Sequence, residues 1–400
     1  MVLNNRKKVK LWDIAKVLSW YAFKSKDFLD AGIPVIKIKN IKIGYVEIKE
    51  DTVFVDENFL SIPDKYHINR WDILISLTWS HISQWNSVVW RVALYREDNI
   101  SLLNQRAWKI IPNLDLIDKY YLYFLLFSND MRYKIASLSK GAASQANISP
   151  TDVESIEFLL PPLPTQKKIA SILSNYDDLI ENNTRRIKIL EEQAQLIYKE
   201  WFVKFQFPWY ESVQMIDSGT EFGEIPEGWE VKEIWSDVTI KKWKNITRET
   251  IVEWTIPVVA GWLSPAYFHD KPNVFGPVIT ISASGANSWY VNIYYEDIWA
   301  SDCGYLSRKE TNRIYFYNTQ LKVRQKDISH LQRWAAQPHV YPKDVMSLQA
   351  IYSNNWIEDL FEKKVDSIYK EIANLQKQNQ NLKQTRDMLI PKLVSGEVLV

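Results

Sequence analysis

The chain has 400 residues, of which 46% are hydrophobic and 24% are charged, so two or three domains can each bury a core. The net charge is only +1, and the single cysteine, Cys303, excludes an internal disulfide. No segment reaches the roughly 18 apolar residues that span a membrane, and no secretory signal follows the basic start, so we expect a cytoplasmic protein.

Short segments rich in β-branched and aromatic residues predict strands in two separate parts of the chain. These segments are residues 33–38, 53–55, 72–77, 88–95, 278–282 and 290–295. Residues 116–138 instead carry a helical pattern. Each of the two parts is therefore predicted to be a mixed α and β domain.

A long helix is predicted after the first domain. Pro161, Pro162 and Pro164 disfavour helix before Thr165, a suitable N-cap, and Pro208 ends it. From 166 to 203 such a helix would extend on the order of 57 Å. Its residues alternate by four and three at Ile172, Tyr176, Leu179, Asn183, Arg186, Leu190, Gln193 and Ile197. This spacing is typical of a coiled-coil seam.

The chain repeats itself once, with a period of roughly 200 residues that is too long for a solenoid. The matching pieces are 138–143 with 331–336, Gln145 with Gln337, Pro150 with Pro342, 152–153 with 344–345, 33–36 with 256–259, and 9–12 with 231–235. The repeated unit is one domain followed by one helix. Residues 206–229 are interpreted as the linker between the two units.

The second unit also ends in a helix with the 4,3 alternation, predicted to stop at Pro391. Its seam consists of Phe361, Val365, Ile368, Ile372, Leu375, Asn379, Leu382, Arg386 and Leu389. Two such helices favour mutual pairing, although each helix packing on its own domain stays open. Buried asparagines fix register in coiled coils, which makes Asn183 and Asn379 candidates for that role.

Motifs for catalysis are sparse. The sequence has no phosphate-binding loop, no dinucleotide-binding glycine turn and no zinc-ligand spacing among its one cysteine and five histidines. Glu47 and Lys49, with Asp30 upstream, form a short nuclease-like pattern that could hold Mg²⁺. The second repeat offers no equivalent, so a solvated strand edge is the preferred interpretation, and we expect no metal site.

Several long segments carry a family resemblance. They are 159–170, followed by Ile172, Leu173, Asp177 and Ile180, then 196–205, 389–397, 298–303 and 103–106. Together they resemble the specificity subunits of type I restriction-modification systems. The resemblance covers nearly the whole chain, and its order of parts matches the internal duplication.

The resemblance implies an α+β fold in which two target recognition domains are separated by two long antiparallel helices that form a coiled coil. The implied boundaries are 1–160 for the first domain, 161–207 for the first helix, 208–350 for the linker and second domain, and 351–400 for the second helix. It also implies a non-catalytic DNA-binding subunit that docks two modification subunits, which methylate adenine with S-adenosylmethionine. Restriction subunits would translocate and cut with ATP and Mg²⁺, so this chain itself would hold no cofactor.

DNA reading requires polar side chains that reach base edges and others that contact phosphates. Loops 78–86, 140–147, 284–290 and 333–339 have this composition. The candidate DNA-binding residues are Thr78, Ser80, His81, Gln84, Arg106, Lys140, Ser144, Gln145, Asn147, Ser284, Asn287, Tyr290, Arg333, Gln337 and His339. The duplicated Gln145 and Gln337 suit adenine, whereas Arg106, Lys140 and Arg333 suit guanine or phosphate. An ordinary solvated turn remains the alternative for each single residue.

The residues expected to pair the helices are Ile172, Tyr176, Leu179, Asn183, Leu190 and Ile197 with Val365, Ile368, Ile372, Leu375, Asn379 and Leu382. Two other functions stay open. The near-neutral charge favours a coiled-coil scaffold protein that does not read DNA. A nuclease would use Asp30, Glu47 and Lys49 and would cleave DNA with Mg²⁺ alone.

The 11 glycines and 18 tryptophans are unusual, because a chain of this length ordinarily has roughly 28 glycines. Tryptophan stands where the family pattern has glycine at Trp20, Trp71, Trp79, Trp90, Trp108, Trp209, Trp262 and Trp289. Within the chain, Trp334 aligns with Gly141, and Trp71 falls near Gly276. By contrast, Trp201, Trp229 and Trp299 match family tryptophans. We hypothesise that a stop-type codon is read as glycine in the source; the alternative is genuine tryptophan in a divergent protein.

Overall fold

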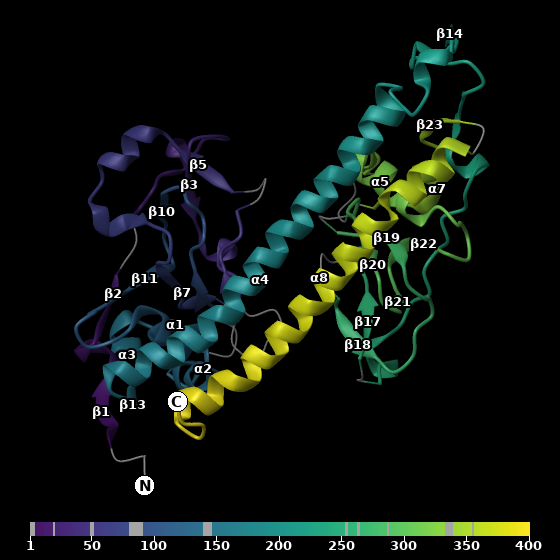
Figure 1. Ribbon diagram of the computed structural model, residues 1–400. Coiled ribbons are helices and arrows are strands. Elements are labelled where there is room, and N and C mark those ends of the chain that lie inside the picture. The colour runs from purple at the N-terminus through teal and green to yellow at the C-terminus, as the bar shows by residue number, and fades with distance from the viewer. Residues whose placement is uncertain are drawn as a thin grey trace. The chain divides into compact units, whose positions relative to one another are not determined.

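The computed structural model describes residues 5–18, 21–48, 52–79, 91–138, 146–252, 255–261, 265–285, 288–332, 339–353 and 356–400. The chain forms two compact units. Unit 1 contains Met1–Glu181 and Gln380–Val400, and unit 2 contains Asn182–Asn379. Two long helices, α4 (Leu163–Tyr198) and α8 (Trp356–Ser395), contribute to both units (Figure 1).

Unit 1 has a five-stranded sheet in the order β2-β11-β7-β9-β4 and a four-stranded sheet in the order β5-β3-β10-β6. Two further strand pairs are β1-β13 and β12-β8. The bounds are β1 Lys7–Lys10, β2 Ala15–Leu18, β3 Ile33–Ile36, β4 Gly44–Tyr45, β5 Val53–Val55, β6 His67–Ile68, β7 Ile73–Ser76, β8 Thr78–Trp79, β9 Val92–Leu94, β10 Ser101–Leu103, β11 Ala107–Pro112, β12 Ala146–Asn147 and β13 Glu157–Leu160. The predicted strands thus recur at 33–36, 53–55, 73–76 and 92–94, while 88–90 lie outside the described residues.

The helical segment predicted at 116–138 is two helices, α1 (Lys119–Phe127) and α2 (Asn129–Ala136). Asp118 caps α1 by accepting the Tyr121 N–H, and the extended backbone of Ser128 separates the two helices. The buried face of α1 packs on the five-stranded sheet together with Leu173 of α4 and Ile390 of α8. Helix α3 (Pro150–Glu154) follows, with Pro at its first position and a capping box between Ser149 and Asp152.

Unit 2 contains two three-stranded sheets, β18-β17-β21 and β20-β19-β22, and the strand pairs β14-β15 and β16-β23. Its helices are α5, α6 and α7 besides its parts of α4 and α8. The bounds are β14 Met215–Asp217, β15 Glu224–Pro226, β16 Glu230–Glu233, β17 Ile256–Val259, β18 Tyr267–His269, β19 Val278–Ser282, β20 Val291–Tyr294, β21 Trp299–Ala300, β22 Cys303–Ser307, β23 Gln349–Tyr352, α5 Ile314–Val323, α6 Gln325–His330 and α7 Pro342–Met346.

The two units share a core of corresponding strands and helices, which confirms the duplicated α+β fold predicted from the sequence. In unit 1, β10 lies parallel to β3 and β11 lies antiparallel to β7. In unit 2, β21 lies parallel to β17 and β22 lies antiparallel to β19. The pair α1–α2 corresponds to α5–α6, and α3 to α7, which also begins with proline.

Of the three helix limits predicted from prolines, the end before Pro208 is confirmed and the other two were wrong. Helix α4 begins at Leu163 rather than at Thr165, because Pro164 lies in the first turn, where no N–H bond is required. Helix α8 continues through Pro391 to Ser395. On either side of this proline, Ile390 and Leu393 are buried in the unit 1 core, and their burial holds the last turn in place. None of the described helices combines the length and apolarity needed to cross a membrane.

The segment interpreted as a linker, 206–229, has structure of its own. It forms the β14–β15 hairpin, in which Met215 pairs with Pro226. Phe207 and Trp229 are buried in the unit 2 core and their rings stack with centroids 5.0 Å apart. The segment is therefore an ordered part of unit 2.

Candidate nucleic-acid interface

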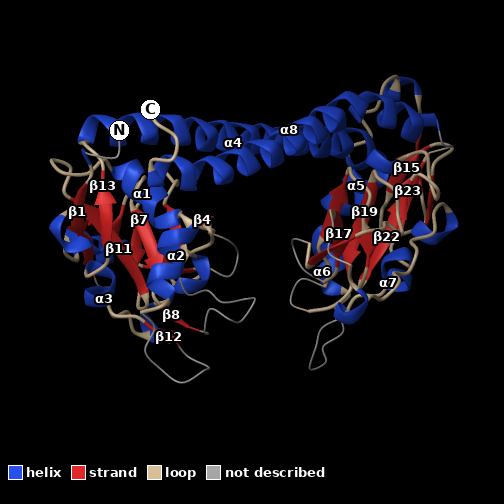
Figure 2. Cartoon of the chain, turned by 90° about the horizontal axis from the view of Figure 1, so that it is seen from below, coloured by secondary structure: helices blue, strands red, loops and turns tan. Residues whose placement is uncertain are grey.

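In unit 1 the structure joins two of the loops predicted to read DNA. Strands β8 and β12 pair antiparallel, with Thr78 opposite Asn147 and Trp79 opposite Ala146. The pairing continues into the domain through a bond from the Ile148 N–H to the Leu77 carbonyl (3.2 Å). Figure 2 shows this strand pair at the end of unit 1 that faces away from α4 and α8.

Unit 2 joins the corresponding two loops in the same way. Ser284 forms a β-bridge with His339, and the Val340 N–H donates to the Ala283 carbonyl (3.0 Å). The Ser284 hydroxyl donates to the Asp302 carboxylate, and the His339 ring stacks on Tyr341. Each domain therefore brings together one loop that follows a central sheet strand and one that precedes its third helix.

A tight turn adjoins the joined loops in each domain. Arg106, with φ of 68°, directly precedes β11, whose Ala107 pairs with Ser76, two residues before Thr78. Asp302, with φ of 55°, directly precedes β22 and contacts Ser284. Arg106 is exposed, so its guanidinium is free to approach a base edge or a phosphate.

The structure describes the other predicted DNA-binding residues to different extents. Tyr290 is half-buried, and the Lys322 ammonium of α5 lies 4.5 Å from its ring centroid, so Tyr290 packs against α5. For Thr78 and Asn147 the structure describes the backbone position alone. Nine candidates lie outside the described residues: Ser80, His81, Gln84, Lys140, Ser144, Gln145, Asn287, Arg333 and Gln337. They remain predictions.

Sequence reasoning missed a group of exposed lysines beside the turn of unit 2. Lys241 bridges to Tyr305, and the Lys244 N–H donates to the carbonyl of Ala300, two residues before Asp302. Lys241, Lys242 and Lys244 are exposed, so they present three cations next to this turn. The signal that reveals them is the run Lys-Lys-Trp-Lys, which suits phosphate contacts.

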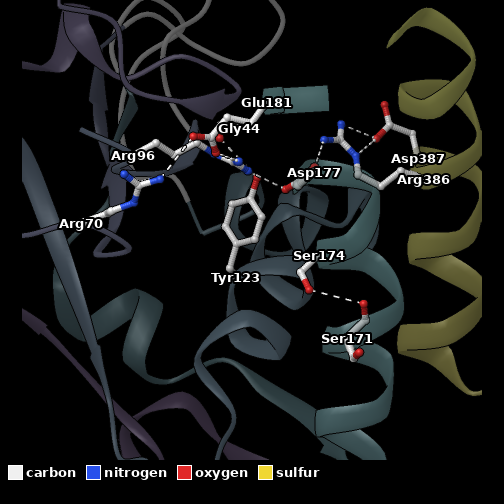
Figure 3. Close-up of polar contacts among 10 residues, drawn as sticks. All are labelled: Gly44, Arg70, Arg96, Tyr123, Ser171, Ser174, Asp177, Glu181, Arg386 and Asp387. Carbon is white, nitrogen blue, oxygen red and sulfur yellow. Dashed lines mark hydrogen bonds and ion pairs between the residues drawn. The ribbon is translucent and has the colours of Figure 1, made fainter. Parts of the chain in front are cut away.

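In unit 1 the helices meet through a charged cluster, shown in Figure 3. The carboxylate of Asp177, on α4, accepts bonds from Arg96 Nη2 (2.9 Å) and from Arg386 Nη1 of α8. Arg96 also donates to Glu181 (2.7 Å), which pairs with Arg70 as well. The side chain of Asp177 is only 4% exposed. Burial alone lowers the pKa of Arg386 and of Arg96, but the Asp177 carboxylate holds both pKa values above their ordinary range.

Unit 2 connects α8 to its domain with different chemistry. The Tyr369 hydroxyl contacts Asn318 Nδ2 (3.0 Å) and Thr319 Oγ1 (2.7 Å) of α5, and the Tyr369 ring stacks on Tyr315. Glu362 accepts the backbone N–H groups of Tyr315 and Phe316, both at 2.9 Å. Burial raises the pKa of the Glu362 carboxyl, although these bonds and Arg308 act in the opposite direction.

The part of the helix pair that lies in unit 2 is antiparallel. Asn183 Nδ2 approaches Gln378 (3.5 Å), Asn379 Nδ2 donates to Thr184 (3.3 Å), and Arg186 forms an ion pair with Glu371 at 2.7 Å. Residues later in α4 thus contact residues earlier in α8, as in an antiparallel pair. Both candidate asparagines are buried.

The predicted seam fits α8 better than α4. On α8, Val365, Ile372, Leu375 and Asn379 are buried, and Ile368 and Leu382 are half-buried. On α4, Ile172, Tyr176, Leu190 and Ile197 are only half-buried, and Leu179 is 53% exposed. The buried positions of α4 are Gln166, Ile169, Ala170, Leu173, Asp177, Asn183, Ala194 and Tyr198. The prediction for Leu179 is corrected: Leu179 is exposed, and Asp177, whose charge Arg96 and Arg386 neutralise, is buried instead.

No group of three metal-ligating side chains occurs in the part of the chain that the structure describes. In the nuclease-like pattern, Glu47 pairs with Lys42 at 3.3 Å, Asp30 is exposed, and Lys49 lies outside the described residues. Cys303 is fully buried and desolvation raises its pKa, so the thiol is held neutral.

Fold and site together define a duplicated two-domain protein in which each α+β domain adjoins a pair of antiparallel helices and presents joined polar loops. A family model described as the type I restriction modification DNA specificity domain matches residues 4–192. The MjaIX specificity subunit of a type I restriction enzyme from Methanocaldococcus jannaschii is 27% identical over 322 residues, covering 74% of this chain and 73% of the relative. The HindI specificity subunit from Haemophilus influenzae is 22% identical, covering 72% and 79%.

The fold has a solved counterpart as well. The type I restriction-modification S subunit from M. genitalium superposes with a TM-score of 0.53 at 18% identity, covering 97% of this chain and 96% of that one. By its family-model match, its relatives and its fold, the chain is similar to the specificity subunits of type I restriction-modification systems.

Proposed function

We propose that this chain is the specificity subunit of a type I restriction-modification system and that it reads a bipartite DNA target, each domain contacting one half-site through its joined loops. The observation that carries the proposal is the recurrence, in both repeats, of the same loop junction: Thr78 opposite Asn147 and Ser284 opposite His339. Exposed cations adjoin it in both domains, Arg106 in one and Lys244 in the other. Polar groups suited to base edges and cations suited to phosphates thus occur together.

The helices, in this proposal, set the unread gap between the half-sites and dock two modification subunits. The chain itself contributes no catalytic group. S-adenosylmethionine belongs to the modification subunits, and ATP and Mg²⁺ to the restriction subunits. The support is the antiparallel pairing of the helices in unit 2, the contact between Arg386 and Asp177 in unit 1, and the similarity to the family model.

The test is a methylation map made with the chain and its modification subunits. Replacing residues 1–160 by those of another specificity subunit should change one half-site and leave the other intact. Removing seven residues from each helix should change the gap but neither half-site. A map without a bipartite target would contradict the proposal and favour a scaffold, and Mg²⁺-dependent cleavage by the chain alone would favour a nuclease.

A single-residue test concerns Arg106. Arg106→Ala should cost about 1–3 kcal/mol at one base pair if the guanidinium reads guanine. If it contacts phosphate, binding should weaken equally on all sequences and the salt dependence should decrease. Lys188→Ala, an exposed change on α4, is the control and should leave binding unchanged.

A further inference from the structure

Asp177 occupies an unusual position, because its two carboxylate oxygens pair with cations from two different segments. Oδ2 faces Arg96, which follows β9 of the recognition domain, and Oδ1 faces Arg386 of α8. The carboxylate is almost completely buried, and Arg386 is 12% exposed. A single side chain of α4 therefore joins the first domain, its own helix and the second helix.

A slip of the helix pair would destroy this arrangement. Coiled-coil registers shift by whole heptads, since such shifts preserve the apolar seam. One heptad to either side of Arg386, α8 carries Asn379 and Leu393. Neither residue has a positive charge, so every heptad-shifted register leaves Asp177 without its partner on α8. A buried charge without its partner is strongly disfavoured, which makes the pair selective.

The repeat provides an internal comparison. The offset that relates Pro150 to Pro342 also relates Asp177 to Tyr369 and Ala194 to Arg386. The same offset relates Gln166 to Glu358, which are both buried in the first turn of their helices. Tyr369 and Ala194 lie in the apolar core of unit 2, and one heptad from Ala194 stand Ile187 and Trp201. At the position of Tyr369 and Ala194 all registers are apolar, so this pair of positions discriminates little between them.

We propose that Asp177 is the positioning residue that fixes the register of α4 against α8. Its pairing with Arg386 selects one register, whereas Tyr369 and Ala194, at the equivalent positions of unit 2, stabilise the pair without selecting. One consequence rests on the proposed function: the register of the two helices determines the gap length of the DNA target.

The direct test measures register by cysteine cross-linking in the full chain, whose only native cysteine is buried. Asn183→Cys with Gln378→Cys reports the native register, and Asn183→Cys with Thr385→Cys reports a shift of one heptad. With Asp177 present, the native pair should cross-link at least about tenfold faster. Asp177→Asn should lower this ratio severalfold, and Asp177→Glu should restore it.

Glu371→Gln is the matched control, because it removes an exposed ion pair between the same helices and should leave the ratio unchanged. If Asp177→Asn does not fold, Asp177→Asn with Arg386→Gln removes both charges while Arg96 keeps Glu181. An unchanged ratio in a folded variant overturns the inference. The methylation map is separate: a wild-type complex without a bipartite target contradicts the proposed function, whereas a single unaltered gap in the variants contradicts only the link from register to gap.

A different observation supports a second inference. Among the described residues, five that are not glycine have a left-handed backbone: Trp71, Arg106, Phe205, Trp209 and Asp302. Trp71 has φ of 72° and Trp209 has φ of 69°. A bulky aromatic residue is a rare occupant of this region, which glycine adopts freely. Both tryptophans are among those that stand at glycine positions of the family pattern.

The surroundings of Trp209 agree with this interpretation. Its side chain is 69% exposed, and its aromatic neighbour, Trp356, is exposed as well. Trp229, at a family tryptophan position, is instead buried and stacked on Phe207. We infer that residues 71 and 209 are glycine in the protein that the source cell makes.

Two measurements test this inference. The source DNA should carry a stop-type codon at 71 and 209 but TGG at 201 and 229. Peptide mass spectrometry of the protein from its own cell should find glycine at 71 and 209. Ordinary TGG codons at all four positions, or tryptophan in the native peptides, would overturn it.

Discussion

In each unit, one side chain joins the domain to the long helices, but the two units use different chemistry for this connection. In unit 1, Asp177 joins α4 to Arg96 of the domain and to Arg386 of α8 through buried charges. In unit 2, Tyr369 joins α8 to Asn318 and Thr319 by its hydroxyl and to Tyr315 by ring stacking. Because both positions derive from one duplicated helix, the difference arose after duplication. Aromatic packing can stabilise several registers of the two helices, whereas a buried ion pair is satisfied in only one register.

The largest difference between the two units is expected when the buried charge of Asp177 is removed. Asp177→Ala should lower the free energy of unfolding by about 3–5 kcal/mol, because Arg386 loses its buried partner. Chemical denaturation of the purified chain measures the effect. Asp387→Ala, which removes an exposed carboxylate from the same arginine, should cost less than about 1 kcal/mol. Equal losses of unfolding free energy in both variants would show that the buried carboxylate of Asp177 contributes no more than the exposed one of Asp387.

In unit 2 a smaller loss is expected. Tyr369→Phe keeps the stacked ring but removes a hydroxyl that contacts Asn318 and Thr319, so unfolding should require about 1–3 kcal/mol less. Tyr133→Phe, on an exposed side chain, is the control and should have no effect. A loss as large as that of Asp177→Ala would show that both connections depend equally on polar contacts.

The comparison also extends to the backbone of unit 2. Trp209→Gly should raise the free energy of unfolding by about 1 kcal/mol, since the left-handed conformation strains a residue with a side chain. Trp229→Gly should instead lower it by about 3–5 kcal/mol, because its buried ring fills the core. Thermal melting of both variants distinguishes them, and a loss of stability at position 209 would count against glycine there.

The smallest effect concerns pH. Burial raises the pKa of Glu191 on α4, while Lys322 of α5 opposes the shift and Glu192 adds to it. A raised pKa in the folded state adds stability at low pH, which is lost as the pH rises through that pKa. Relative to Glu191→Gln, the wild type should therefore lose stability as the pH rises through the raised pKa of Glu191 toward neutrality. Denaturation curves at several pH values measure the difference, and parallel profiles would contradict it.

Much of the fold could be predicted because short stretches of the sequence are enough to reveal the repeat and the strands. The seam of α8 was predictable since Val365, Ile372 and Leu375 are both apolar and buried. The seam of α4 was not, because Leu179 is apolar yet exposed, while Asp177 is charged yet buried. Only the distant Arg96, which follows β9, and Arg386 of α8 explain the burial of Asp177, and no local pattern contains them.

Other features depend on contacts far apart in the chain. Pro391 lies inside α8 because the flanking residues Ile390 and Leu393 are buried in the core of unit 1. The polar loops were recognisable by composition, but their junctions, Thr78 with Asn147 and Ser284 with His339, required the fold. The identity of the base contacts stays a prediction, since most candidate residues lie outside the described part of the chain.

The strand pairing at the base of each domain has an evolutionary consequence. The strand that opens each domain lies antiparallel beside the strand that closes it, with Lys7 opposite Leu160 and Glu230 opposite Tyr352. Arg6, just before the first of these strands, bonds to the last turn of α8 at Val394. The first and last strands of each domain therefore lie side by side next to the long helices, so that the domain can be regarded as a cassette inserted between them. Genetic recombination can exchange a whole cassette without interrupting those helices, so new preferences can be inherited in one event.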